Sequence, residues 1–143
     1  MSYQTLIGDI ETVLSSVKAI KEHYAYPLNG SPSKFPAVIF FPEALDNQFQ
    51  STGDNAKEYT FKLWVVVSYQ QGEDQKVFSE VLPRVVDQVT EKFDATWNGG
   101  TTTDGHRIWY RLGSAFWGSY TNEQKGLEAF CEMTLTVRFA RSV

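Results

Sequence analysis

Two short stretches of the chain match the serine-x-x-lysine pattern of penicillin-recognising enzymes, in which a lysine lies one helical turn after a nucleophilic serine. The stretches are Ser31 to Lys34 and Ser15 to Lys18. This chemistry needs the serine at the start of a helix. The first stretch lies in a proline-rich segment and the second in the middle of an expected helix, and the sequence has no Ser-Asp-Asn or Lys-Thr-Gly partner. We interpret both matches as coincidences.

The imidazole and thiol groups of the chain do not suggest a metal site. They are His23, His106 and Cys131. A zinc site usually has three or four ligands, with at least one pair close in sequence, and no such pair exists here. Cys131 alternates with Met133 and Leu135, which favours a buried structural thiol over a nucleophile. We therefore expect no metal, no cofactor and no catalytic residue, so the protein should not be an enzyme.

Two further motifs also lack the context that their chemistry needs. Gly113 and Gly118 have the outer spacing of a phosphate-binding loop, but Ser119-Tyr120 follows where lysine and serine or threonine are required. Asn29-Gly30-Ser31 is a glycosylation sequon, yet the sequence begins without a recognisable signal peptide. We expect neither a nucleotide site nor glycosylation.

The segment from Arg107 to Arg111 contains two arginines and Trp109, which could stack on nucleic acid bases. The net charge of −4 and the pI near 5.1 lack the excess of basic residues that nucleic acid binding needs. We therefore do not expect sequence-specific binding of nucleic acid. The apolar runs are far shorter than the ~18 residues of a membrane span, so we expect no membrane insertion. The single Cys131 cannot form an internal disulfide and no signal peptide is recognisable, so we expect a cytoplasmic protein.

Two amphipathic helices and several strands should position these residues. Apolar residues recur at helical spacing from Tyr3 to Lys21 and again from Val77 to Phe93, where Pro83 should kink or divide the helix. Strands are expected at 36–42, 59–69, 106–112 (with a weaker extension over 115–120) and 127–139, from alternating or β-branched residues. Loops are expected at 24–36, 46–57 and 98–105.

This order of elements indicates one α+β domain over residues 1–143, with a largely antiparallel sheet and both helices packed on one face. The face lined by Phe61, Leu63 and Leu135 should contact the helices. The opposite face then combines large aromatic residues with both signs of charge, as subunit interfaces do. An alternative is that these rings only pack against each other across strands. The interface candidates are Phe49, Lys62, Trp64, Arg107, Trp109, Arg111, Glu128, Phe130, Glu132 and Arg138.

The order of elements also resembles the tail terminator, or tail completion, proteins of long-tailed bacteriophages. The likeness covers nearly the whole chain: an N-terminal amphipathic helix, a proline-rich loop into Phe35 to Ile39, the strand Glu58 to Tyr69, a second helix and the last strand Glu128 to Phe139. It implies a structural virion protein that forms a hexameric ring, which caps the tail tube, ends its polymerisation and joins the tail to the head connector.

The resemblance also implies the partners and the location of the protein. The partners are further copies of the chain, the tail tube protein and head-tail connector proteins, and DNA passes through the ring. The location is the virion, after assembly in the host cytoplasm. Two other interpretations remain: another neck, head-completion or tube-related subunit, or, from a different class, a small-ligand-binding α+β domain.

Overall fold

Four long strands form the body of the computed structural model, which describes residues 3–28, 30–51, 54–96, 98–101, 107–122 and 126–142. These strands pair in the order β2 (Ala37–Ser51), β3 (Asp54–Tyr69), β6 (Gly126–Ser142) and β5 (Arg107–Asn122). Two short strands, β1 (Glu22–Tyr24) and β4 (Asn98–Thr101), complete the six-stranded sheet beside β2 and β5. Among the described strands, only the β1–β2 pair is parallel, so the predicted, largely antiparallel α+β fold is confirmed.

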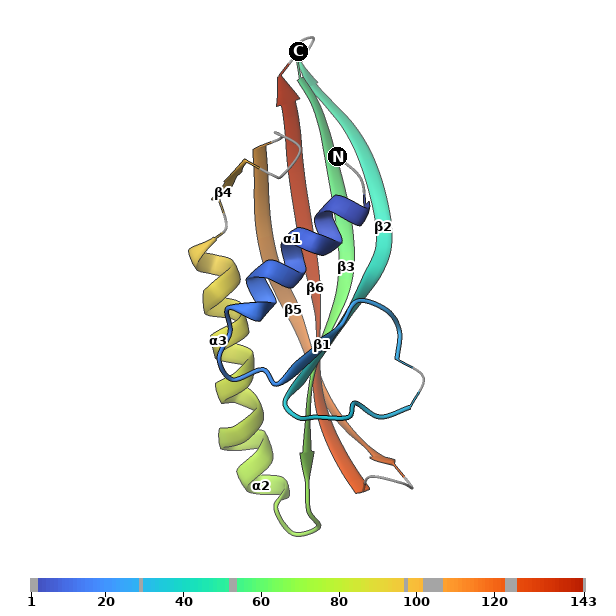
Figure 1. Cartoon of the computed structure of the whole chain (residues 1–143), viewed down its shortest axis with the longest axis vertical. Helices are drawn as coiled ribbons and strands as arrows, with labels where there is room; N and C mark the ends of the chain where they lie inside the picture. The colour runs from blue at the N-terminus through green and yellow to red at the C-terminus, as the bar shows by residue number, and fades with distance from the viewer. Residues whose placement is uncertain are drawn as a thin grey trace.

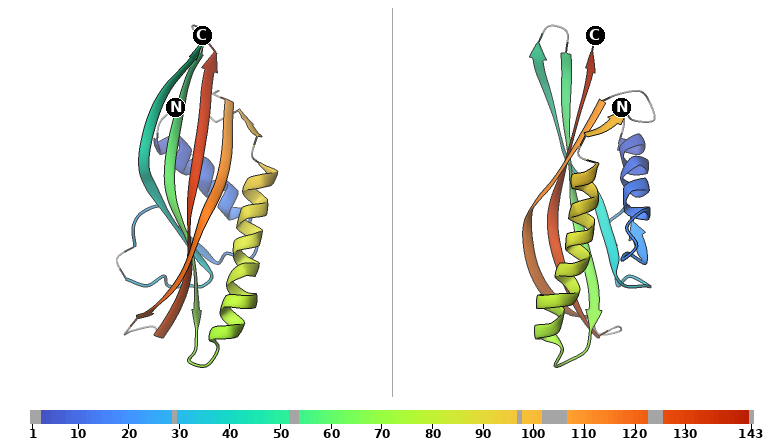
Figure 2. Two further views of the ribbon diagram at one scale, coloured as in Figure 1. Left: turned by 180° about the vertical axis from the view of Figure 1, so that it is seen from behind. Right: turned by 90° about the vertical axis from the view of Figure 1, so that its left-hand side faces the viewer.

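The alternation of the long strands places one set of side chains under the helices. Phe61, Leu63 and Val65 on β3 are fully buried, and Leu135 and Val137 on β6 are buried as completely. Helix residues complete this core. Both helices lie on the same face of the strongly twisted sheet, as the sequence predicts (Figures 1 and 2).

Helix α1 is shorter than predicted. It spans Tyr3–Ser15 and buries Leu6, Ile10 and Leu14 against the sheet. The chain then leaves the helix in a tight turn, in which the N–H of Val17 donates to the carbonyl of Leu14. The hydroxyls of Ser15 and Ser16 donate to carbonyls within the last turn, the local competition that makes serine a poor helix interior residue. The prediction of helix up to Lys21 is therefore wrong.

The second helix is not divided at Pro83: it runs as one long helix over residues 74–95, with a π-helical turn just before the proline. A short α2 (Asp74–Lys76) leads into a π-helical turn, η1 (Val77–Val81), and then into α3 (Leu82–Ala95). The N–H of Leu82 donates to the carbonyl of Val77, five residues earlier. The wider turn accommodates the extra residue, and both Val77 and Leu82 are buried in the core.

Several segments predicted as loops belong to strands instead. Within the polar stretch 46–57, residues 46–51 and 54–57 continue β2 and β3 as a long hairpin, with Asp46 opposite Glu58 and Phe49 opposite Asn55, and residues 52 and 53 lie outside the described part of the chain. Tyr24, the first residue of the predicted loop 24–36, belongs to β1. Residues 98–101 of the predicted loop 98–105 form β4, and its residues 102–105 lie outside the described part of the chain. Long-range pairing overrides the local preference of these polar residues for turns.

One predicted strand end is wrong, and one predicted strand extension is confirmed. Pro42 does not end β2. The strand continues past it through a register shift between Pro42 and Ala44, where β2 has no strand on its outer side among the described residues. The predicted extension 115–120 belongs to the continuous β5, after a register shift between Gly113 and Phe116.

Candidate assembly surface

The sheet face opposite the helices carries most of the predicted interface residues, and the strand register arranges them in rows. Trp109 lies beside Arg138, and Arg138 beside Glu58. Farther along the strands, Trp64 lies beside Glu132. We call this face the open face; it is formed by residues of β2, β3, β5 and β6, including Lys62, Trp64, Trp109, Arg111, Phe116, Tyr120, Glu128, Phe130, Glu132 and Arg138.

Four rings gather in one part of the open face. The Trp64 and Phe130 rings are stacked, with centroids 4.9 Å apart and planes at 14°. Phe116 and Tyr120 approach the Phe130 ring at 6.2 and 5.9 Å. We call Trp64, Phe116, Tyr120 and Phe130 the aromatic cluster. Its rings pack against each other across strands, as the alternative interpretation expects. Phe116 is nevertheless 61% exposed, so a partner protein could also contact the cluster.

Gly118 makes room for the aromatic cluster. It lies opposite Phe130 on the neighbouring strand, and a Cβ built on Gly118 would lie 2.7 Å from Cζ of that ring. Any side chain at position 118 would have to displace the ring. The glycine therefore lets Phe130 lie flat over β5 and reach its neighbours.

Glu128 is an exception among the predicted interface residues, because the subunit buries it completely. Its Oε1 accepts a hydrogen bond from the Tyr120 hydroxyl at 2.9 Å, and its Oε2 accepts one from the Ser31 hydroxyl at 2.8 Å. Burial, reinforced by Glu128, raises the pKa of Tyr120, so this hydroxyl remains a donor at neutral pH. Glu128 thus links the segment after β1 to the sheet.

The charged part of the open face is more accessible. Nζ of Lys62 lies 3.6 Å from Glu132 and 3.9 Å from Glu43, and all three side chains are partly exposed. Arg111 is exposed and Arg138 is half-buried. Exposed ion pairs of this kind add little stability, but they can select and orient a partner.

The prediction found some members of this surface and missed others. Lys62, Trp64, Phe130 and Glu132 lie together, and Trp109, Arg111 and Arg138 lie farther along the same face. The side chains of Phe49 and Arg107 are outside the described part of the structure. Phe116, Tyr120 and Ser31 were not predicted. The bulge after Gly113 changes the alternation of β5, and only the glycine signals it in the sequence.

Ser15, His23 and Glu11 lie side by side in the arrangement of a catalytic triad, with the histidine between the serine and the carboxylate. Nε2 of His23 lies 3.4 Å from Oγ of Ser15, and Nδ1 of His23 lies 3.5 Å from Oε2 of Glu11. The Ser15 hydroxyl, however, donates its proton to the carbonyl of Glu11 at 2.7 Å. Ser15 also ends α1, where backbone carbonyls would repel the developing oxyanion of acyl transfer. This geometry fits a clamp between α1 and β1 better than a nucleophile.

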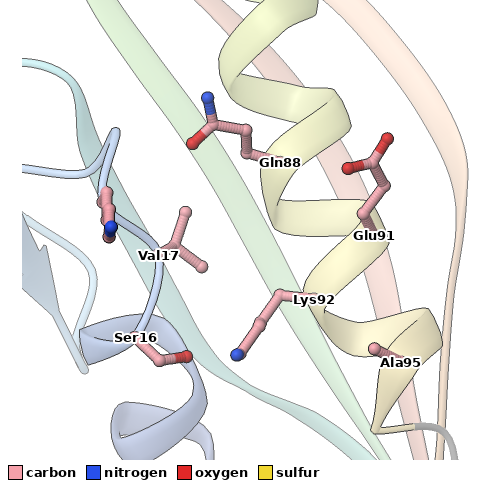
Figure 3. A pocket seen from close by; sticks show the side chains of 7 residues that line it. Ser16, Val17, Gln88, Glu91, Lys92 and Ala95 are labelled. Carbon is pink, nitrogen blue, oxygen red and sulfur yellow. The ribbon is translucent and has the colours of Figure 1, made fainter.

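An open groove of about 300 Å³ lies between the turn after α1 and the end of α3. Figure 3 shows Lys92 and Ser16 pointing toward each other across it, with Gln88 and Glu91 on the α3 side. Such an open groove differs from the enclosed apolar pockets that hold most small ligands.

Neither a metal cluster nor a membrane helix is found in the described chain. Its histidine, cysteine and acidic residues form no group of three that could hold a metal ion. Among the same residues, no helix is long and apolar enough to cross a membrane.

The sequence matches no protein-family model and no curated protein. Among solved structures, the fold is similar to a chain from the virion of a native gene transfer agent particle, with a TM-score of 0.51. The two sequences are 14% identical, and the match covers 97% of this chain and 91% of the other. This likeness extends over the whole sheet and both helical regions, so it establishes the fold.

Proposed function

We propose that the protein is a structural component of a phage-like virion. In this proposal, copies of the chain form a closed ring, hexameric in the family that the sequence resembles. The ring caps the tail tube, ends tube polymerisation and joins the tail to the head connector. The protein works by binding other proteins and not by catalysis.

The observation that carries the proposal is the extent of the structural likeness, 97% of this chain against a chain of a gene transfer agent virion. Because the match spans both helical regions and all of the long strands, it concerns the whole architecture and not a common substructure. It agrees with the independent resemblance of the sequence to a family of phage virion proteins.

The open face provides a second, physical argument for assembly. A solvated sheet face has no need of a 61% exposed phenylalanine beside a stacked Trp64–Phe130 pair. Aromatic residues and arginine are enriched in the buried centre of protein interfaces, and both are present here. The proposed partners are neighbouring copies of the chain, the tube protein and connector proteins, in the virion and during assembly in the host cytoplasm.

Another neck, head-completion or tube-related subunit would use the same kind of surface at a different place in the virion. A small-ligand-binding domain is the candidate from a different class, and the groove beside Lys92 is the feature that would serve it. The two candidates predict different behaviour. A ring protein is oligomeric and binds the ends of tail tubes, whereas a ligand-binding domain is monomeric or dimeric and does not bind tubes.

A tube-length assay tests the proposed function. The tube protein of the same particle is polymerised with and without this chain, and tube lengths are measured by electron microscopy. We expect the chain to stop growth at substoichiometric amounts and to be found at tube ends. Unchanged tube lengths together with unoccupied ends would refute the capping role.

A further inference from the structure

The sheet leaves two strand edges open, at opposite ends and on opposite sides. On one side, β1 pairs only with residues 37–39 of β2, so the described residues 40–51 have no strand on their outer side. On the other side, β4 pairs with β5 at Trp109 and Arg107 only, so residues 110–122 are open among the described residues. Open backbone edges of this length are normally blocked, because they accept strands from other chains.

Each open edge contains a regular run that another strand could pair with. After the bulge at Gly113, residues 116–122 of β5 stay in uninterrupted register with β6. Between its two register shifts, β2 is regular from Ala44 to Phe49. A run of seven residues is roughly 23 Å long, which is the length of an ordinary strand.

The β5 edge carries two large exposed side chains in succession. Phe116 is 61% exposed and Trp117 is 41% exposed. Phe116 lies opposite Glu132 on the open face, and Trp117 lies opposite the buried Cys131 on the other face. Successive residues of a strand point to opposite faces, so these two rings flank the open edge on both sides. They would cover the side chains of an added strand above and below the sheet.

We propose that the β5 edge, Phe116 to Asn122, pairs with the β2 edge, Ala44 to Phe49, of a second copy of this chain. This inference rests on the proposed ring and specifies how its subunits join. The strand directions support it: β2 and β3, β3 and β6, and β6 and β5 are each antiparallel, so β5 runs opposite to β2. A second copy in the same orientation, placed with its β2 edge beside the β5 edge, therefore continues the antiparallel sheet.

Pairing between unlike edges also distinguishes a ring from a dimer. Two β5 edges paired with each other would form a two-fold dimer and leave both β2 edges open. The β2–β5 contact is heterologous, so it repeats from subunit to subunit until the ring closes. Because the two edges lie at opposite ends of the sheet, neighbours are shifted along the strands, and closed sheets need such a stagger.

Amide hydrogen exchange measured on the free subunit and on the assembled protein tests the pairing. We expect exchange to slow at least about tenfold in both 44–49 and 116–122 on assembly, as for amides that gain a backbone hydrogen bond. Assembled rings in which these segments exchange as fast as in the monomer would overturn the pairing but keep the ring. Dimers protected only at 116–122 would overturn it in favour of β5–β5 contact. A protein that stays monomeric would overturn the ring itself.

A matched pair of variants adds an independent measurement by sedimentation. Trp117→Ser removes one of the rings that flank the β5 edge, and we expect at least about tenfold weaker self-association. Tyr26→Ser is the control: Tyr26 is 54% exposed but lies outside the strands, so its loss should change association less than about twofold. Thermal melting confirms that both variants fold. Equal association of the two variants would contradict the role of the β5 edge.

Discussion

At the scale of single residues, the group Ser15, His23 and Glu11 most resembles an active site, and we predict that it is not one. The Ser15 hydroxyl already donates a hydrogen bond to a backbone carbonyl. The end of α1 also presents carbonyl oxygens where an oxyanion would need hydrogen-bond donors. We expect Ser15→Ala and His23→Ala to leave hydrolysis of a simple aryl ester at the background rate of the unaltered protein. Saturable turnover that either substitution abolishes, in a protein that still folds, would refute this prediction.

Gly118 gives a second prediction at this scale. Gly118→Ala brings a methyl group to 2.7 Å from the Phe130 ring, which is held by its stack with Trp64. We expect the free energy of unfolding to fall by about 1–3 kcal/mol, as for other overpacked sites. Gly113→Ala on the same strand is the control, because nothing lies within 4 Å of its Cβ position. Urea unfolding measures both variants, and equal losses would show that the ring moves aside freely.

At the scale of elements, we predict that the hairpin formed by the ends of β2 and β3 contacts a neighbouring subunit on assembly. Its segment 46–57 is rich in Asp, Asn, Gln and Ser, with Phe49 as its one large apolar residue besides Leu45 at its border. Little apolar surface is available to stabilise it alone, so we expect contact with a neighbouring subunit to stabilise it.

Phe49→Ser tests the hairpin prediction. We expect the variant to fold normally, with an unchanged melting temperature, and to assemble at least about tenfold more weakly. Normal assembly of this variant, with equal exchange of 46–57 in the free and assembled protein, would mean that the hairpin is only a connector.

The elements also show what the sequence could predict and what it could not. The buried alternation of Phe61, Leu63 and Leu135 predicted both the strands and the face that the helices cover. Local composition misled at 46–57, where polar residues form strands only because distant partners pair with them. The end of α1 was overestimated because Val17 is buried by a turn, not by a helix. Of the aromatic cluster, Trp64 and Phe130 were predicted. Phe116 and Tyr120 were not, because the bulge after Gly113 cannot be located from alternation alone.

At the scale of the whole molecule, the open face should contribute more to assembly than to folding. Trp64 and Trp109 are half-buried in the single subunit. We expect Trp64→Ala and Trp109→Ala to weaken self-association by about 2 kcal/mol or more, and to lower the free energy of unfolding by less. Sedimentation and thermal melting of the same samples compare the two effects.

Phe61→Leu is the matched control on β3, because Phe61 is fully buried on the opposite face. It should lower the melting temperature and leave the association of the folded protein unchanged. If the tryptophan variants behave like Phe61→Leu, their rings belong to the core and the open face is not an interface.

Copies of this chain are proposed to form a closed ring that caps a tail tube. Negative-stain electron microscopy of the purified protein, alone and mixed with tail tubes of the same particle, tests it most directly. We predict closed rings of uniform size in the first sample and the same rings seated on tube ends in the second. Monomeric particles in the first sample and bare tube ends in the second would contradict the claim.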